Sequence, residues 1–232
     1  MPAMDSHSVG ADGVGSGFTI SGFSTDTTNE VVFVLTVAQS GSGGGADGGH
    51  AQVSSVTDNA GLTWTKRSGV LNADSDVDTE LWWAPSPAVL AADSINVFLS
   101  RTSRCAFLVF AVTGLADINN PIDNDPSCPS PTGYPNNSVA SPPISTQQAR
   151  CLVMLPCGVY GDETSPTVSS PFAVNFHHNG TYVSAWIATD SRLTQALNLQ
   201  AVVAGGIEDL NILADACKGP GWLRFDTFVG GC

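Results

Sequence analysis

The stretch from Gln52 to Thr113 most constrains the fold, because it holds one short strand-like segment after another. Side chains of a strand alternate between its two faces, so Ile95, Val97 and Leu99 should share one face. Turn-forming residues separate the segments, which predicts a succession of strands with no long helix between them. The predicted strands are residues 52–57, 62–66, 80–84, 94–100 and 105–112.

Two details of this stretch predict how its strands are placed. The first two segments flank Asp58-Asn59-Ala60-Gly61, whose residues tolerate turn dihedrals, so a hairpin is expected there. Residues 105–112 are apolar almost throughout, which is typical of a strand covered on both faces. The stretch therefore predicts the middle of an all-β domain.

The rest of the chain continues the same rhythm and extends the predicted β domain over residues 17–217. Pro156 interrupts an apolar strand and predicts a bulge or an edge position there. The sequence His177-His178-Asn179-Gly180 carries the Asn-Gly signal of a hairpin turn. The further predicted strands are residues 18–22, 31–37, 151–160, 172–176, 181–188, 197–203 and 210–216.

Three segments lie outside this pattern. Residues 1–16 are small and polar and are expected to form an N-terminal arm, either disordered or ordered by a partner. Residues 115–145 contain seven prolines and cannot form a central strand, so they are expected to form a long loop that contacts another subunit or decorates the surface. Residues 218–232 form a C-terminal tail whose aromatic side chains must bury on the sandwich or on a partner.

Composition and charge exclude several classes of function. Only 12% of the residues are charged, and 24 glycines and 14 prolines favour short strands joined by turns. The formal net charge is −13, with two lysines and six arginines, so no basic surface for phosphate groups is expected and an anionic membrane would repel the chain. We therefore expect no binding to nucleic acid and none to membranes.

The N-terminal residues predict where the chain folds. Residues 1–7 lack both the basic start and the apolar stretch of a secretory signal peptide, and no apolar run approaches the ~18 residues of a membrane span. We expect folding in the cytoplasm of the cell that makes the protein.

The six cysteines do not predict a disulfide framework, because their spacings lack close pairs and the core is large enough without them. Cys105 and Cys151 lie in apolar strands and are expected to be buried thiols. Cys128 and Cys232 are the best placed to cross-link. A zinc site is not expected, because no pair of cysteines has the required short spacing.

Two motifs suggest ligands but lack the required context. Gly43, Gly45 and Gly48 have the spacing of a dinucleotide-binding loop, yet a strand follows them where the motif needs a helix. The segment Asn72–Glu80 alternates carboxylates that could chelate calcium, but it does not fit the register of an EF-hand. A flexible loop and a solvated acidic loop are the preferred interpretations.

No set of residues predicts catalysis. The chain has only four glutamates, and none is arranged as the alternating carboxylates of a β-sandwich glucanase. No nucleophile-elbow sequence occurs, and His177 and His178 are interpreted as exposed turn residues. We therefore predict no catalytic, cofactor-binding or metal-binding residue, no bound cofactor and no enzymatic activity.

Four segments together resemble a known β-sandwich module: Val56–Trp64, Glu80–Pro85, Ser94–Leu99 and Val109–Gly114. They are similar to the jelly-roll modules of tailed-bacteriophage structural proteins and of bacterial surface proteins, over roughly Phe18 to Cys217. The resemblance implies an antiparallel β-sandwich of jelly-roll type with long loops. It also implies a role as a head-decoration protein, a head fibre or a tail appendage.

Two functions are weighed. The first is a non-enzymatic virion protein that binds capsid or tail proteins and copies of itself through the arm, the long loop and the tail; such proteins leave the host by lysis and need no signal peptide. The second is a carbohydrate-binding or adhesion module that takes a host-surface glycan. It would use Trp82 or Trp83, one of which should point outward or lie under a neighbouring loop, the covered position being preferred, or Tyr182 with Trp186 as a stacking platform. The first is preferred.

Overall fold

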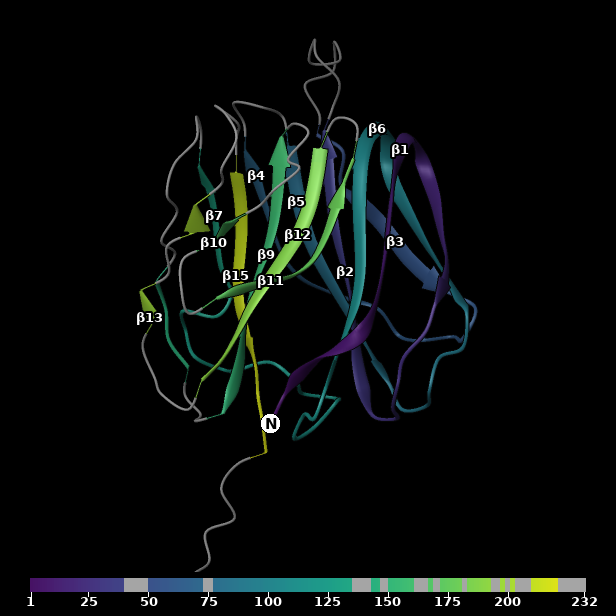
Figure 1. The fold of residues 1–232 in the computed structure, drawn as a ribbon. Coiled ribbons are helices and arrows are strands. Elements are labelled where there is room, and N and C mark those ends of the chain that lie inside the picture. Colours follow the sequence, from purple (N-terminus) through teal and green to yellow (C-terminus); the bar gives the residue numbers. More distant parts are fainter. Residues whose placement is uncertain are drawn as a thin grey trace, which may run out of the picture.

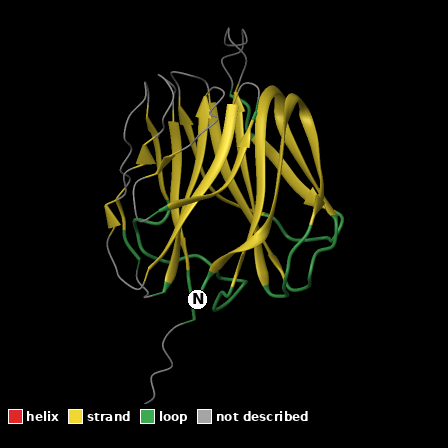
Figure 2. Cartoon of the chain, viewed as in Figure 1, coloured by secondary structure: helices red, strands yellow, loops and turns green. Residues whose placement is uncertain are grey.

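The computed structural model is built from strands (Figures 1 and 2). The structure describes residues 1–39, 50–72, 77–134, 143–146, 150–160, 167–168, 172–180, 183–192, 197–198, 201–202 and 210–220. Within these ranges no helix is long and apolar enough to cross a bilayer.

The first sheet comes from the N-terminal half, which we define as residues 1–113. Its strand order is β1-β6-β2-β5-β4, and β3 pairs with β6 off this path; all pairings are antiparallel. The strands are β1 (Ala3–Phe23), β2 (Glu30–Gln39), β3 (Val53–Asp58), β4 (Thr65–Asn72), β5 (Val77–Ser86) and β6 (Asp93–Thr113).

The second sheet comes from the C-terminal half, which we define as residues 130–217. Its order is β11-β12-β9-β15-β7, again antiparallel, and two further strand pairs, β8–β13 and β10–β14, accompany it. The strands are β7 (Ser130–Tyr134), β8 (Pro143–Ile144), β9 (Cys151–Tyr160), β10 (Thr167–Val168), β11 (Ala173–Asn179), β12 (Val183–Arg192), β13 (Leu197–Asn198), β14 (Ala201–Val202) and β15 (Leu210–Cys217). The expected all-β antiparallel sandwich is confirmed.

The two halves have the same topology, which the sequence analysis did not detect. Read from its other edge, the second sheet is β7-β15-β9-β12-β11, which matches β1-β6-β2-β5-β4 strand for strand. A register shift falls at the same place in both: between Lys66 and Ser68 in β4, and between Val174 and Phe176 in β11. A shared bulge in a shared strand order indicates an internal structural repeat.

Contacts between the halves follow the same correspondence. Strand β4 contacts β7 and β15, while its counterpart β11 contacts β1 and β6. Likewise β5 contacts β15 and β9, while β12 contacts β6 and β2, and β2 contacts its own counterpart β9. Each contact has a partner related by an approximate two-fold axis, as at the isologous interface of a symmetric dimer.

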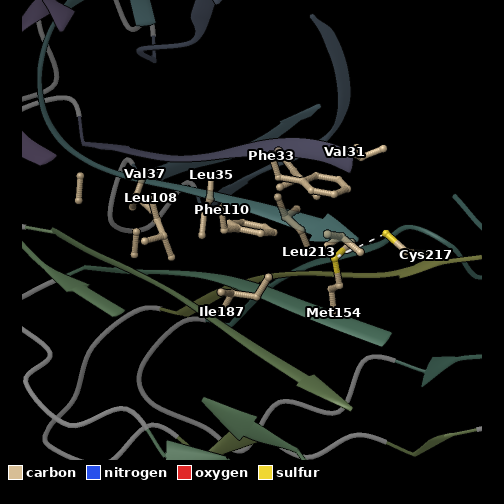
Figure 3. Close-up of a cluster of buried hydrophobic side chains, with 14 of the residues drawn as sticks. Val31, Phe33, Leu35, Val37, Leu108, Phe110, Met154, Ile187, Leu213 and Cys217 are labelled. Atoms are coloured by element: carbon tan, nitrogen blue, oxygen red, sulfur yellow. Dashed lines mark hydrogen bonds between the residues drawn. The ribbon is translucent and has the colours of Figure 1, made fainter. Parts of the chain in front are cut away.

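Three apolar cores hold this arrangement, and alternation along the strands assigns residues to them. In β2, Val31, Phe33, Leu35 and Val37 face the central core between the halves, which Figure 3 shows in part. The intervening residues of β2 face the N-terminal core, where β1 and β6 fold over toward β3 (Figure 1). Strand β9 likewise separates the central core from the C-terminal core. Both faces of these strands are buried, which explains their continuous apolar sequences.

Three sequence-based expectations are wrong. Residues 1–16 are no arm, because from Ala3 onward they belong to β1 and hydrogen-bond with β6. The turn at residues 58–61 makes no hairpin, since β3 pairs with β6 and β4 pairs with β5. Pro156 lies in the central strand β9 without a bulge; the ladder to β15 merely lacks Leu155 and Pro156.

Other expectations agree with the structure or lie outside it. The Asn-Gly hairpin is confirmed, because β11 and β12 pair across it. Part of the long loop of residues 115–145 is the strand β7, which lies at the edge of its sheet as its prolines require. Of the tail, only residues 218–220 are described, so Trp222, Phe225 and Phe228 lie outside the described residues.

Candidate functional site

The acidic segment Asn72–Glu80 contributes to a buried polar cluster. Residues 73–76 lie outside the described residues, but Asp78 and Glu80 lie in β5 and are only 6% and 1% exposed. For these two residues the expectation of a solvated loop is wrong. Their side chains alternate with those of Thr79 and Leu81 and share a face with Trp82. We call Lys66, Asp78, Glu80 and Trp82 the β5 acidic cluster.

Glu80 is the centre of the cluster, and both of its oxygens are engaged. Oε1 accepts hydrogen bonds from the main-chain N–H of Val53 at 3.2 Å and from Lys66 Nζ at 3.0 Å. Oε2 accepts one from the Trp82 indole N–H at 2.8 Å. Glu80 thus ties β4 and β5 to the start of β3, which belongs to the opposite wall of the N-terminal core.

Asp78 is held in an unfavourable environment for a charge. Burial, reinforced by the negative charge of Glu80, raises the pKa of Asp78 to about 7, although the nearby Lys66 ammonium acts in the opposite direction. A hydrogen bond between the two carboxyl groups also favours the protonated form of Asp78. At neutral pH the Asp78 carboxyl is therefore close to half-protonated.

The β5 acidic cluster is arranged to join strands. Glycosidases need two carboxyl groups separated by about 5 Å or more, with room for a sugar between them. Here the two groups hydrogen-bond directly, and both are buried. Their partners are the protein's own N–H groups, so the cluster presents no free acid–base pair to a substrate.

The adjacent tryptophans divide between two cores. Trp82 packs against the N-terminal core and Trp83 against the central core, and each keeps part of its surface exposed. Neither points fully outward, because each is half-buried. Trp64 lies at the edge of the N-terminal core as well, where its indole N–H donates to Asp58 Oδ2 at 2.6 Å.

The two adjacent histidines are not turn residues. Both lie in β11 and are partly buried. His178 Nε2 lies 3.1 Å from Asp12 Oδ1 of β1, and its ring covers Gly10 so closely that a Cβ there would collide with it. The His178–Asp12 pair therefore joins the edges of the two sheets.

The five described cysteines are free and buried. Burial raises the pKa of the Cys105, Cys128 and Cys151 thiols to about 12, which keeps them protonated at neutral pH. The expectation of buried Cys105 and Cys151 thiols is confirmed. Cys128, one of the two cysteines best placed to cross-link, is a free, buried thiol 3.2 Å from the Ser145 carbonyl oxygen. These thiols are unsuited to nucleophilic catalysis.

One hollow on the described surface lies beside the turn after β3. It is open, has a volume of about 310 Å³, and is lined by residues 59–60 and 89–93. Its charged group is Asp93, whose Oδ1 accepts the main-chain N–H of Asn59 at 3.2 Å and of Ser94 at 2.8 Å. The hollow therefore brings no set of reactive side chains together.

Several residues considered from sequence lie outside the described part of the chain. These are the glycine motif at residues 43–48, Tyr182 and Cys232, together with the side chain of Trp186. Comparison of the chain with protein-family models, with curated proteins and with solved structures finds no match.

Proposed function

We propose that the protein is a non-enzymatic structural component of a phage virion, such as a capsid decoration or cement protein, a head fibre or a tail appendage. It would bind capsid or tail proteins and copies of itself. The observation that carries this proposal is that the described acidic and basic side chains of the β5 acidic cluster and of the sheet contacts pair with other groups of the protein itself. They join strands and sheets to one another.

The construction of the described core also favours a role as a rigid building block. The central strands β2 and β9 are buried on both faces between the apolar cores, which holds the two large sheets in a fixed arrangement. The net charge of −13 keeps such a unit soluble at high local concentration.

The folding of residues 1–16 into β1 changes which segments would attach the protein to a particle. A strand hydrogen-bonded to β6 along its length is not available as a free arm. The candidate attachment segments are therefore the loop of residues 115–145 and the tail of residues 218–232.

Quantitative mass spectrometry of purified particles from the source organism tests this proposal. We expect the protein at a fixed copy number per particle, and we expect a chain lacking residues 221–232 to fold but to bind particles less tightly. Recovery of the protein only from the soluble fraction, with none on particles, would contradict a virion role.

A carbohydrate-binding or adhesion module is the second candidate, because Trp82 and Trp83 are half-exposed on opposite faces of one strand. Stacking on a sugar ring needs one open face of an indole ring, and such contacts are typical of aromatic side chains at binding surfaces. Binding on a glycan array that Trp83→Ala or Trp82→Ala abolishes, while Trp64→Ala does not, would favour this candidate over the first.

A further inference from the structure

The start of β1 departs from regular pairing in a way that gathers polar side chains. Met4 pairs with Val112 and Ser8 with Phe110, so three residues of β1 face a single residue of β6. Bulges of this kind re-aim side chains. Here Asp5 and His7 both turn toward Asp26, which lies in the connection between β1 and β2.

The three side chains lie at the spacing of metal ligands. His7 Nδ1 is 3.0 Å from Asp5 Oδ1 and 3.4 Å from Asp26 Oδ1, and one ligand atom from each residue lies within 4.8 Å of the other two. A tetrahedral ion with bonds of about 2.0 Å separates its ligand atoms by about 3.3 Å. The observed spacing therefore accommodates an ion after only a small adjustment.

A third carboxylate, that of Glu30, lies beside the cluster and supports a cation site there. Glu30 is fully buried, its Oε1 accepts hydrogen bonds from the Thr27 N–H and hydroxyl, and its Oε2 is buried without any hydrogen-bond partner. It lies beside Asp5, which is itself 3% exposed, and the two carboxyl groups interact directly. Both Asp5 oxygens accept main-chain hydrogen bonds, from His7 and Asp26, so Glu30 Oε2 is the one carboxylate oxygen of this pair left without a donor. A buried carboxylate oxygen without a donor is costly, and a nearby cation stabilises it.

We propose that Asp5, His7 and Asp26 bind one divalent metal ion of the Zn²⁺ or Mn²⁺ class, with the buried carboxylate of Glu30 beside them. Carboxylates with one imidazole and no thiolate suit these ions, whereas Ca²⁺ prefers oxygen ligands alone. The ion would replace the proton on His7 Nδ1 and would fix the start of β1 to the β1–β2 connection. His7 and Asp26 are each about half exposed, which gives the ion a path of entry.

Titration of the chelator-treated full chain with ZnCl₂, MnCl₂ and CaCl₂ tests the proposal, by calorimetry and by elemental analysis of the bound metal. We expect one Zn²⁺ or Mn²⁺ ion per chain and a higher melting temperature in its presence. The variants His7→Ala and Asp26→Asn should each weaken binding by roughly tenfold or more. Because both side chains are half exposed, both variants should fold, which circular dichroism checks.

The matched control is His178→Ala. It removes the histidine of another His–Asp pair, between His178 of β11 and Asp12 of β1, at a similar distance of 3.1 Å. Among the described residues this pair belongs to no three-ligand cluster. It should bind metal like the unmodified chain. Absence of saturable binding of Zn²⁺ and Mn²⁺ at millimolar concentration would overturn the proposal, and so would binding that His7→Ala and Asp26→Asn leave unchanged.

Discussion

The N-terminal and C-terminal halves share a strand order and a bulge, yet they fill equivalent positions with different chemistry. The shared bulge aligns β5 with β12, and strand pairing then aligns the pair Phe33–Phe110 with the pair Met154–Asp215. In the N-terminal half the two rings stack in the central core, with centroids 5.3 Å apart. In the C-terminal half the corresponding pair places a carboxylate at the same depth.

The charge of Asp215 is balanced from the other half. Arg67, at the bulge of β4, makes two hydrogen bonds to Asp215, of 2.7 and 3.1 Å. Its counterpart at the bulge of β11, Asn175, is exposed and only accepts a hydrogen bond from Thr189 of the neighbouring strand. Pairing register and alternation therefore define the repeat, while the Arg67–Asp215 ion pair, which has no equivalent at Asn175, specifies which faces of the two halves meet.

The largest expected effect comes from removing Arg67. The variant Arg67→Ala leaves the buried Asp215 without a counter-ion and with only the Ala216 N–H as a donor, and it should lower the free energy of unfolding by roughly 3–5 kcal/mol, measured by urea denaturation. Burial already raises the pKa of Asp215, and loss of the guanidinium would raise it further.

The equivalent variant Asn175→Ala provides the control, with an expected loss of about 0.5 kcal/mol, because that side chain is exposed. The double variant Arg67→Leu/Asp215→Leu should recover most of the lost stability. Equal losses from Arg67→Ala and Asn175→Ala would show that the ion pair does not distinguish the halves energetically.

A smaller effect is expected where the approximate axis passes between β2 and β9. Gly158 of β9 corresponds to Val37 of β2, and the two residues meet: a Cβ on Gly158 would lie 2.8 Å from Val37 Cγ2 and would collide with the Thr79 hydroxyl. Gly158→Ala should therefore cost about 1–3 kcal/mol. In a double-mutant cycle by urea denaturation, Val37→Ala should relieve part of this cost; strictly additive effects would mean that the two positions do not share this space.

The next prediction concerns Asp78, whose counterpart in β12 is Ser184. The unfolded chain loses the Asp78 proton near pH 4, whereas the folded chain keeps it until about pH 7. Folding then binds a proton over this interval, so the contribution of Asp78 to stability falls as the pH rises toward 7. Asp78→Asn should raise the free energy of unfolding by about 1–2 kcal/mol near pH 8 and change it little near pH 4. A gain that is the same at both pH values would contradict this assignment.

The smallest effect concerns local opening of the two halves. Cys105 lies in the N-terminal core, beneath the long strands β1 and β6, while Cys157 lies in the C-terminal core, whose described outer strands are two residues long. We expect a thiol reagent to label Cys157 several-fold faster than Cys105 under native conditions, as followed by mass spectrometry. Faster labelling of Cys105 would reverse the predicted order.

Much of the fold follows from the sequence because alternation reports burial directly. The apolar run of residues 105–112 predicted a strand buried on both faces, and this part of β6 is buried throughout. The apolar runs of β2 and β9 predicted strands, which the structure confirms. Pairing partners could not be derived this way. The turn at residues 58–61 has hairpin chemistry, yet the pairing of β3 with the start of β6 and of β4 with β5 outweighs the local preference.

The polar clusters were harder to predict, because their members come from distant parts of the chain. Residues 1–16 alternate small and polar side chains, and only their pairing with the apolar strand β6 makes them a strand. Asp5 and His7 consequently looked like parts of a disordered arm. The spacing of Asp5 and His7, two residues apart as on one strand face, was the only local signal of the proposed metal site.

The approximate two-fold contact between the halves has a consequence for assembly. The N-terminal half of one chain can pack on the C-terminal half of a second chain as it does on its own. Two chains whose halves have come apart can therefore form a domain-swapped dimer that keeps the native contacts between halves. Such a swap requires only transient opening of the interface between the two halves in each chain. Refolding at high concentration is therefore expected to yield such pairs alongside single chains.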